Sequence, residues 1–173
     1  MVESMGLEAA HEKPEEAFSV MEPSQEVSSN PLDTPLVECF EWRLVSNRLM
    51  TRGCEAAQDM RFYMVVFRSK RREGADSKAL YAADANAHEE AKHSGGLLMY
   101  WYGSLNERRE CFATCIWKSR EDALRATKLP KHIEAAMLAS QMYEFYRLEK
   151  YWLTFSIDGE PRFEDVNGII AHI

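Results

Sequence analysis

Long apolar runs are missing from this sequence. No stretch approaches the roughly 20 apolar residues that a membrane-spanning helix needs. The first residues, MVESMGLEAAHEKPEEAF, lack the basic and apolar stretches of a secretory signal, and they carry too much Glu for a mitochondrial presequence. We therefore expect a cytoplasmic protein without a membrane partner.

Positive charge is also sparse. The chain has 21 Lys and Arg against 28 Asp and Glu, which gives a net charge of -7. A nucleic-acid-binding face needs clustered cations to neutralise phosphates, and the short KRR run at residues 70–72 is more typical of a solvated loop. There is no Gly-rich phosphate loop and no GxSxG motif, so we expect no nucleic-acid partner and no nucleotide or other cofactor.

Closely paired cysteines are absent as well. The four cysteines, Cys39, Cys54, Cys111 and Cys115, form no CxxC motif. Cys111 and Cys115 lie four residues apart on an expected strand, about 13 Å along it, which is too far for a disulfide. The histidines are scattered, so no metal site is expected, and buried free thiols in a reducing compartment are the favoured interpretation.

The pattern of residue types predicts two regions. Residues 1–34 are rich in Glu, Ser and Pro with little apolar periodicity, so we expect a disordered acidic tail. Residues 35–173 are expected to form one domain, in which the amphipathic run 36–50 favours a helix or a strand. Further along, strands are expected at 61–70, 97–103, 111–119 and 146–157, and helices at 76–96 and from Ser119 to about 145 with a restart at Pro130.

This order of elements predicts an α+β fold. Strand, helix, strand, strand, helix, strand is the βαββαβ arrangement of ferredoxin-like proteins, with an antiparallel sheet and both helices on one face. Simple alternation along LLMYWY puts Leu98, Tyr100 and Tyr102 on one sheet face and Leu97, Met99 and Trp101 on the other. Both faces are apolar, so we expect helices to cover one and a second copy of the chain to cover the other, as a homodimer.

Three segments carry a resemblance to a known family. FYMVVFRSK, AADANAHEEAKHSGGLLMYWYG and ATCIWKSREDALRATKLPKHIEAA together resemble a fungal family of unknown activity with the dimeric α+β-barrel fold, over residues 60–155. The antibiotic-biosynthesis monooxygenase group shares that fold. The resemblance implies a small-molecule enzyme of secondary metabolism, either a cofactor-independent monooxygenase or a cyclase or isomerase, acting on a hydrophobic aromatic or polyketide-like metabolite.

Candidate catalytic residues lie on the two expected helices. Asp84 and His88 are four residues apart at the edge of the apolar face, so the carboxylate could orient the imidazole as a general base. A structural hydrogen-bonded pair is the alternative. The resemblance implies a ligand-facing histidine on the second helix, where this chain has His132, although a surface histidine at a helix start is the alternative there.

Candidate substrate-binding residues lie on the strands. The aromatic side chains could line a pocket with a few polar groups, or they could simply fill the core. Arg68 could bind an acidic group of a ligand or pair with a surface carboxylate. The aromatic candidates are Tyr100, Trp101, Tyr102 and Trp117.

Three functions remain open at this point. An enzyme is the leading hypothesis. A non-catalytic dimeric ligand-binding or stress-response module is the alternative, and it predicts a filled cleft. Haem binding through a histidine ranks last because the sequence has no haem-specific motif.

Overall fold

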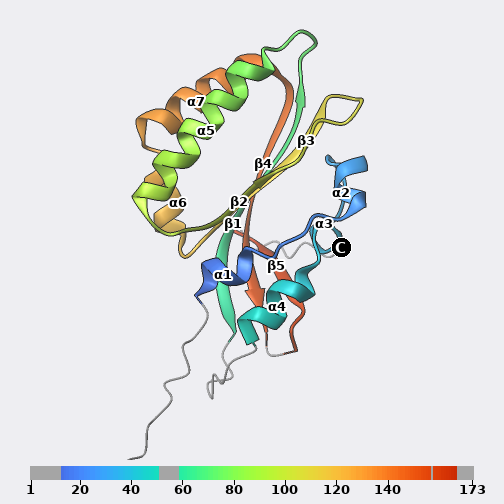
Figure 1. Ribbon diagram of the computed structural model, residues 1–173, viewed down its shortest axis with the longest axis vertical. Helices are drawn as coiled ribbons and strands as arrows, with labels where there is room; N and C mark the ends of the chain where they lie inside the picture. The colour runs from blue at the N-terminus through green and yellow to red at the C-terminus, as the bar shows by residue number, and fades with distance from the viewer. Residues whose placement is uncertain (1–12, 51–58, 157, 167–173) are drawn as a thin grey trace, which may run out of the picture.

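The computed structural model describes residues 13–50, 59–156 and 158–166 (Figure 1). The central layer is one five-stranded sheet in the order β2-β3-β1-β4-β5, and every neighbouring pair of strands is antiparallel. Its strands are β1 (Met60–Arg71), β2 (Leu97–Tyr102), β3 (Glu110–Trp117), β4 (Tyr143–Phe155) and β5 (Pro161–Asp165). The first four strands have the ferredoxin-like order, which confirms the predicted fold class, and β5 extends the sheet beyond β4.

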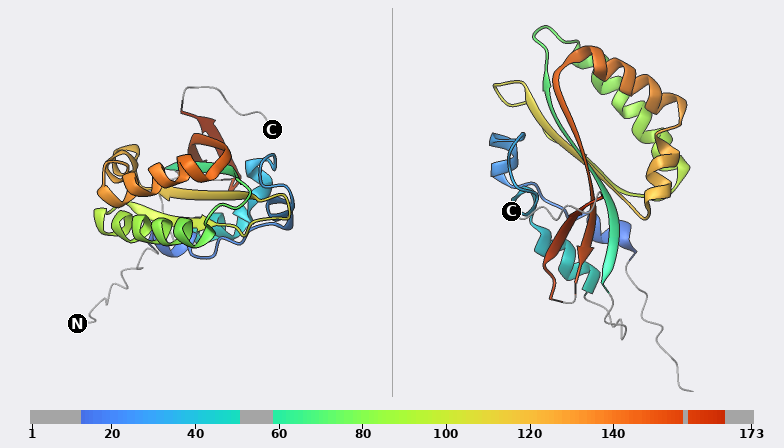
Figure 2. Two further views of the ribbon diagram at one scale, coloured as in Figure 1. Left: turned by 90° about the horizontal axis from the view of Figure 1, so that it is seen from above. Right: turned by 180° about the vertical axis from the view of Figure 1, so that it is seen from behind.

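Helices cover both faces of this sheet. One face carries α5 (Ser77–Ser94), α6 (Arg120–Ala126) and α7 (Pro130–Met142), and α5 and α7 lie side by side (Figures 1 and 2). The other face carries four short helices from the start of the chain. These are α1 (Pro14–Phe18), α2 (Gln25–Ser29), α3 (Leu36–Cys39) and α4 (Trp42–Met50).

Local sequence explains where the longer helices begin and end. The Asp76 side chain accepts a hydrogen bond from the amide of Ala79 at 2.9 Å, which caps the start of α5. Gly95 follows α5 with φ +83°, a conformation that glycine adopts without strain. Ser119 caps α6 in the same way as Asp76 caps α5, and Pro130 is the first residue of α7, where its missing N–H costs nothing.

The N-terminal segment overturns two expectations. Residues 13–34, predicted to be disordered, are ordered, and residues 1–12 lie outside the described residues. Phe18 is buried and its ring meets the ring of Phe62 edge to face, with centroids 5.1 Å apart. The apolar sheet face that was expected to meet a partner subunit is therefore covered by residues 14–50 of the same chain. The amino-acid composition could not predict the order of residues 13–34, because the few apolar residues of this acidic segment are held by contacts with the sheet and not by local propensity.

A β-bulge changes the predicted faces of β2. The pairing of β2 with β3 shifts between Leu97 and Met99. As a result Leu98 packs with Met99 and Trp101 on the N-terminal side, while Leu97 packs with Tyr100 on the helix side. Simple alternation misassigned Leu97 and Leu98 because a bulge adds one residue to the count along the strand.

Candidate functional site

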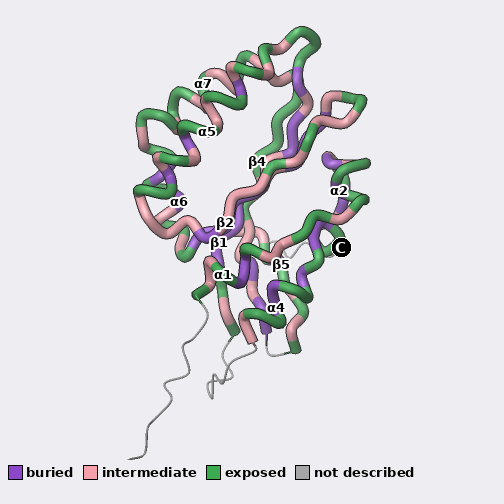
Figure 3. Tube along the Cα trace, viewed as in Figure 1, coloured by how far each residue is buried: buried purple, intermediate pink, exposed green. Residues whose placement is uncertain are grey.

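A cavity of about 180 Å³ lies between the sheet and helices α5 and α7. Small side chains on the two facing helices leave this space open, whereas larger ones would fill it. The helices contribute Ala87, Ala91, Ala135, Ala136 and Ala139 to its lining. Figure 3 shows that the helix layer is less buried than the sheet beneath it, and α7 has no buried residue at all.

All three predicted catalytic residues line this cavity. Asp84 and His88 reach it from α5, and His132 reaches it from α7. The expected hydrogen bond between the His88 ring and the Asp84 carboxylate is not formed, and the hydroxyl of Tyr100 donates to Asp84 Oδ1 at 2.5 Å instead. His88 packs against the same tyrosine, with ring centroids 4.8 Å apart.

Burial sets the protonation of these groups. Burial raises the pKa of Asp84, and the hydrogen bond from Tyr100 and the charge of His88 offset only part of that effect. Burial lowers the pKa of His88 and, separately, that of His132 below the ordinary 6.5. Both imidazoles are therefore neutral at neutral pH, which is the form that accepts a proton.

The aromatic candidates divide between the two faces of the sheet. Tyr100, Tyr102 and Trp117 line the cavity. Trp101 points away from it and packs on the N-terminal side, with its ring centroid 5.2 Å from that of Phe40. Trp101 is therefore a core residue, which was the alternative considered from the sequence.

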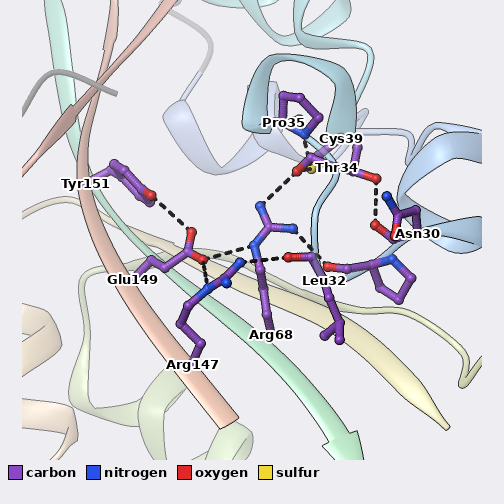
Figure 4. A network of polar contacts seen from close by, with 10 residues as sticks. Asn30, Leu32, Thr34, Pro35, Cys39, Arg68, Arg147, Glu149 and Tyr151 are labelled. Atoms are coloured by element: carbon purple, nitrogen blue, oxygen red, sulfur yellow. Dashed lines mark hydrogen bonds and ion pairs between the residues drawn. The ribbon is translucent and has the colours of Figure 1, made fainter. Parts of the chain in front are cut away.

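Arg68 also lies outside the cavity, in a polar network on the N-terminal side (Figure 4). Its Nε donates to Glu149 Oε1 at 3.0 Å, and its two terminal nitrogens donate to the carbonyls of Pro31 at 2.8 Å and Thr34 at 2.9 Å. Glu149 is held in turn by the Tyr151 hydroxyl at 3.0 Å. Arg68 thus joins the loop between α2 and α3 to the sheet, and the substrate-binding role expected for it does not fit this position.

A second buried arginine, Arg71, lines the cavity and was missed from the sequence. It ends β1 and is 5% exposed. Its Nη1 donates to Ser77 Oγ at 2.8 Å, and its guanidinium lies 4.5 Å from the centroid of the Tyr81 ring. The KRR run was interpreted as a solvated loop, but β1 continues to residue 71. Period-two alternation from Phe67 through Ser69 would have placed Arg71 on the cavity face.

Other residues of the cavity were not among the candidates. The sequence pattern started the last strand at residue 146, whereas β4 begins at Tyr143, so Tyr143 was left outside the strand. Tyr146 lay inside the predicted strand and lines the cavity as well. Cys111 and Cys115 line it as well, and burial raises the pKa of Cys115 to about 12, so its thiol stays protonated.

The predicted free thiols can be checked at three positions. Cys39, Cys111 and Cys115 are buried and free, as expected, while Cys54 lies outside the described residues. The described part of the chain has no group of three side chains placed to hold a metal ion. No helix within that part is long and apolar enough to cross a membrane.

The fold and the cavity together define a ferredoxin-like α+β protein with an internal space of small-molecule size. Within that class, the chain belongs to the PB2B2.08-like family, whose profile matches residues 4–165. A relative in fission yeast, UPF0643 protein PB2B2.08 of Schizosaccharomyces pombe, is 37% identical over 71 residues. That match covers 40% of this chain and 32% of the relative, so it spans about a third of the relative's length, and it confirms the resemblance to a fungal family.

Solved structures with a similar chain path were also found. A protein from Shewanella oneidensis is 16% identical, with a TM-score of 0.48, over 55% of this chain and 93% of that one. SnoaB, a cofactor-independent oxygenase from Streptomyces nogalater, is 11% identical, with a TM-score of 0.42, over 50% of this chain and 89% of its own.

Proposed function

We propose that the protein is an enzyme that binds a small hydrophobic aromatic molecule in this cavity and moves a proton with His88 or His132. The observation that carries the proposal is the convergence of two neutral imidazoles and the carboxyl group of Asp84 in an otherwise largely apolar cavity. Perturbed titratable groups gathered in one apolar pocket are typical of catalytic sites.

The volume of the cavity limits the size of the substrate that it could hold. An engineered cavity of about 150 Å³ in another protein holds benzene, so about 180 Å³ suits one substituted ring or a compact two-ring molecule. This supports a substrate at the small end of the aromatic and polyketide-like metabolites that the family resemblance implies. The role in secondary metabolism and the cytoplasmic location remain part of the proposal.

Proton abstraction is the step that the residues support. A neutral imidazole of His88 or His132 takes a proton from an acidic O–H or C–H group of the substrate and becomes an imidazolium, and the substrate keeps the electron pair. The Tyr100 hydroxyl stays protonated, because burial and the neighbouring charge of Asp84 raise its pKa. The resulting anion could rearrange, as in a cyclase or isomerase, or react with O₂ as co-substrate, as in a monooxygenase.

The test starts with native mass spectrometry of the freshly purified protein, to identify a retained small molecule and supply a substrate. Turnover of that molecule is then compared in His88→Gln, His132→Gln and, as the matched control, His93→Gln, whose exposed ring hydrogen-bonds the Glu89 carbonyl near the end of α5. Loss of the base lowers kcat by about 10²–10⁴-fold, while the control is unchanged. Full turnover in both cavity variants would overturn the assignment, and binding without any turnover in wild type would favour the non-catalytic module.

The homodimer stays part of the proposal on a different surface. We infer that copies pair through the outer edge of β4, because residues 143–149 have no neighbouring strand on that edge within the described ranges. Phe145, Tyr146 and Leu148 are exposed there, and Leu148 is 45% exposed. An unpaired strand edge with exposed apolar side chains favours antiparallel pairing with a second copy.

A further inference from the structure

Arg71 is a buried cation that forms no ion pair with a carboxylate of the described residues, although its charge lowers the pKa of Asp84 in the same cavity. Its side chain donates a hydrogen bond to Ser77, contacts the face of the Tyr81 ring and lies close to the Tyr143 hydroxyl. Its Nε is buried and has no hydrogen-bond partner among the described residues. Those residues also include no carboxylate that forms an ion pair with it, so the protein itself leaves one donor of this guanidinium unused.

The other buried arginine of β1, Arg68, has hydrogen-bond partners for its guanidinium and serves as a comparison. Arg68 is 3% exposed, close to the 5% of Arg71, yet it has one carboxylate partner and two carbonyl partners. Buried charges in proteins are paired because an unpaired one loses its hydration without compensation. A partner for Arg71 is therefore expected from outside the chain, and the cavity that Arg71 lines is the place where it would enter.

The neighbouring groups leave this position open to an anion. Asp84 shares the cavity, but its carboxyl group accepts the hydrogen bond of Tyr100 and forms no ion pair with Arg71 within the described residues. His88 and His132 are neutral at neutral pH, as argued above. Arg71 is thus the one described cavity residue that carries a full positive charge.

We propose that Arg71 binds the acidic group of the ligand, so that the cavity takes a small aromatic acid whose ring lies against the alanine and tyrosine side chains. The inference rests on the proposed function, because it assumes that the ligand occupies the same cavity. Arg71 holds the anion through Nε–H, and the ring then lies within the space bounded by His88, Tyr100 and His132.

A pair of probes with the same shape and different charge tests this directly. Benzoate and benzamide are titrated separately into the full chain, and binding is followed by calorimetry and by the NMR signals of the His88 and His132 rings. We expect benzoate to bind about 10- to 100-fold more tightly than benzamide, as a charge-assisted hydrogen bond requires. Arg71→Gln removes this preference. Arg72→Gln, which removes the same charge from the exposed next residue, keeps it.

A measurement on wild type covers the case in which Arg71→Gln does not fold. The Nε–H signal of Arg71 should shift on addition of benzoate and stay in place with benzamide. If both probes move the histidine signals with equal affinity, the cavity binds small molecules but the anion assignment is wrong. If neither probe moves them up to millimolar concentrations, the small-molecule site itself is wrong. A benzoate preference that survives in folded Arg71→Gln also overturns the inference.

Discussion

At the scale of single residues, the two buried arginines of β1 have different roles. Arg68 uses its donors on Glu149 and on the backbone of the N-terminal segment, whereas Arg71 lines the cavity and its Nε has no hydrogen-bond partner among the described residues. The difference follows from their positions on opposite faces of one strand. The first should therefore matter mainly for stability and the second mainly for binding.

Replacing Arg68 tests the first of these roles. Arg68→Met takes one cation from the largely buried Glu149 carboxylate and leaves the carbonyls of Pro31 and Thr34 without this donor. We expect the free energy of unfolding to fall by about 3 kcal/mol, measured by urea denaturation. Arg43→Met breaks an ion pair with Glu160 at the surface, at 3.1 Å, and should cost less than about 1 kcal/mol. Equal losses in the two variants would contradict the buried-network role.

The two cavity histidines predict a pH dependence of stability. Their pKa values are lower in the folded chain than the ordinary 6.5, chiefly because of burial. Between the folded pKa and 6.5 the unfolded chain binds more protons, so stability rises with pH through this window and is lost as pH falls. Asp84 has the opposite sign, since burial raises its pKa above 3.8 and stability then falls as pH rises through that lower window.

Removing both imidazoles isolates their contribution. In the double variant His88→Gln and His132→Gln, the gain in unfolding free energy between about pH 5 and about pH 7.5 should be smaller than in wild type. Urea denaturation at a series of pH values measures this gain. His93→Gln serves as the control because its ring is exposed. A double variant with the wild-type slope would mean that the histidines are not buried in the neutral form.

At the scale of elements, the N-terminal helices act as the cover of one sheet face. Phe18 lies against Phe62 and Phe155, and all three rings are buried. Phe18→Ala should lower the free energy of unfolding by about 3 kcal/mol, because it removes a large apolar contact and leaves a cavity. Val37→Ala, in the same segment but at a side chain that is 43% exposed, should cost less than about 1 kcal/mol.

Thermal and urea unfolding of both variants test whether the N-terminal segment contributes to the core. If Phe18→Ala unfolds like wild type, the segment does not contribute to the core in solution, and the expectation of a disordered tail returns. If Val37→Ala matches Phe18→Ala, the segment is sensitive to any truncation, and the specific role of the Phe18 ring is wrong.

Local pattern was sufficient for the elements that depend on local sequence. RFYMVVFRSK is dense in β-branched and aromatic residues, so β1 could be predicted, and the alanine stripe closed by two glycines predicted α5. The helical period also placed Asp84 and His88 at the edge of the face that now lines the cavity. The bulge in β2 could not be predicted, since register depends on the partner strand and not on β2 alone.

The rest of the site depended on long-range contacts. Arg71 was assigned to a loop because a charged run rarely continues a strand, and the pairing of β1 with β4 shows that the strand does continue through it. The partner of Tyr100 was likewise unpredictable, because Asp84 lies sixteen residues earlier on a helix whose distance from β2 is set by the whole fold. Side-chain pairs between layers are tertiary facts, and one sequence carries no direct signal for them.

At the scale of the whole molecule, the sheet is covered on both faces over much of its length, but β4 runs past its cover. The pairing of β4 with β5 spans only Tyr151 to Phe155, so the earlier half of β4 presents an edge that no described strand meets. The charged side chains of this half of β4 bond to groups of the same chain: Arg147 donates to the carbonyl of Leu32 in the N-terminal segment and to Glu149. The apolar surface available for association is therefore on this edge and not on the face that composition suggested.

A charge placed on this edge tests the association directly. We expect wild type to run as a dimer of the 20.0 kDa chain in size-exclusion chromatography with light scattering, and Leu148→Glu to run as a monomer, because each copy would bring an added negative charge to the paired edge. Leu124→Glu adds the same charge at a side chain of similar exposure on α6, 41% against 45%, and should leave the dimer intact. A wild type that stays monomeric at every concentration would remove the homodimer. A dimer unaffected by Leu148→Glu would exclude β4 as the interface. Residues 14–50 already cover the opposite sheet face. The exposed apolar residues of α7, Ile133 and Met137, would then be the next candidate surface for pairing.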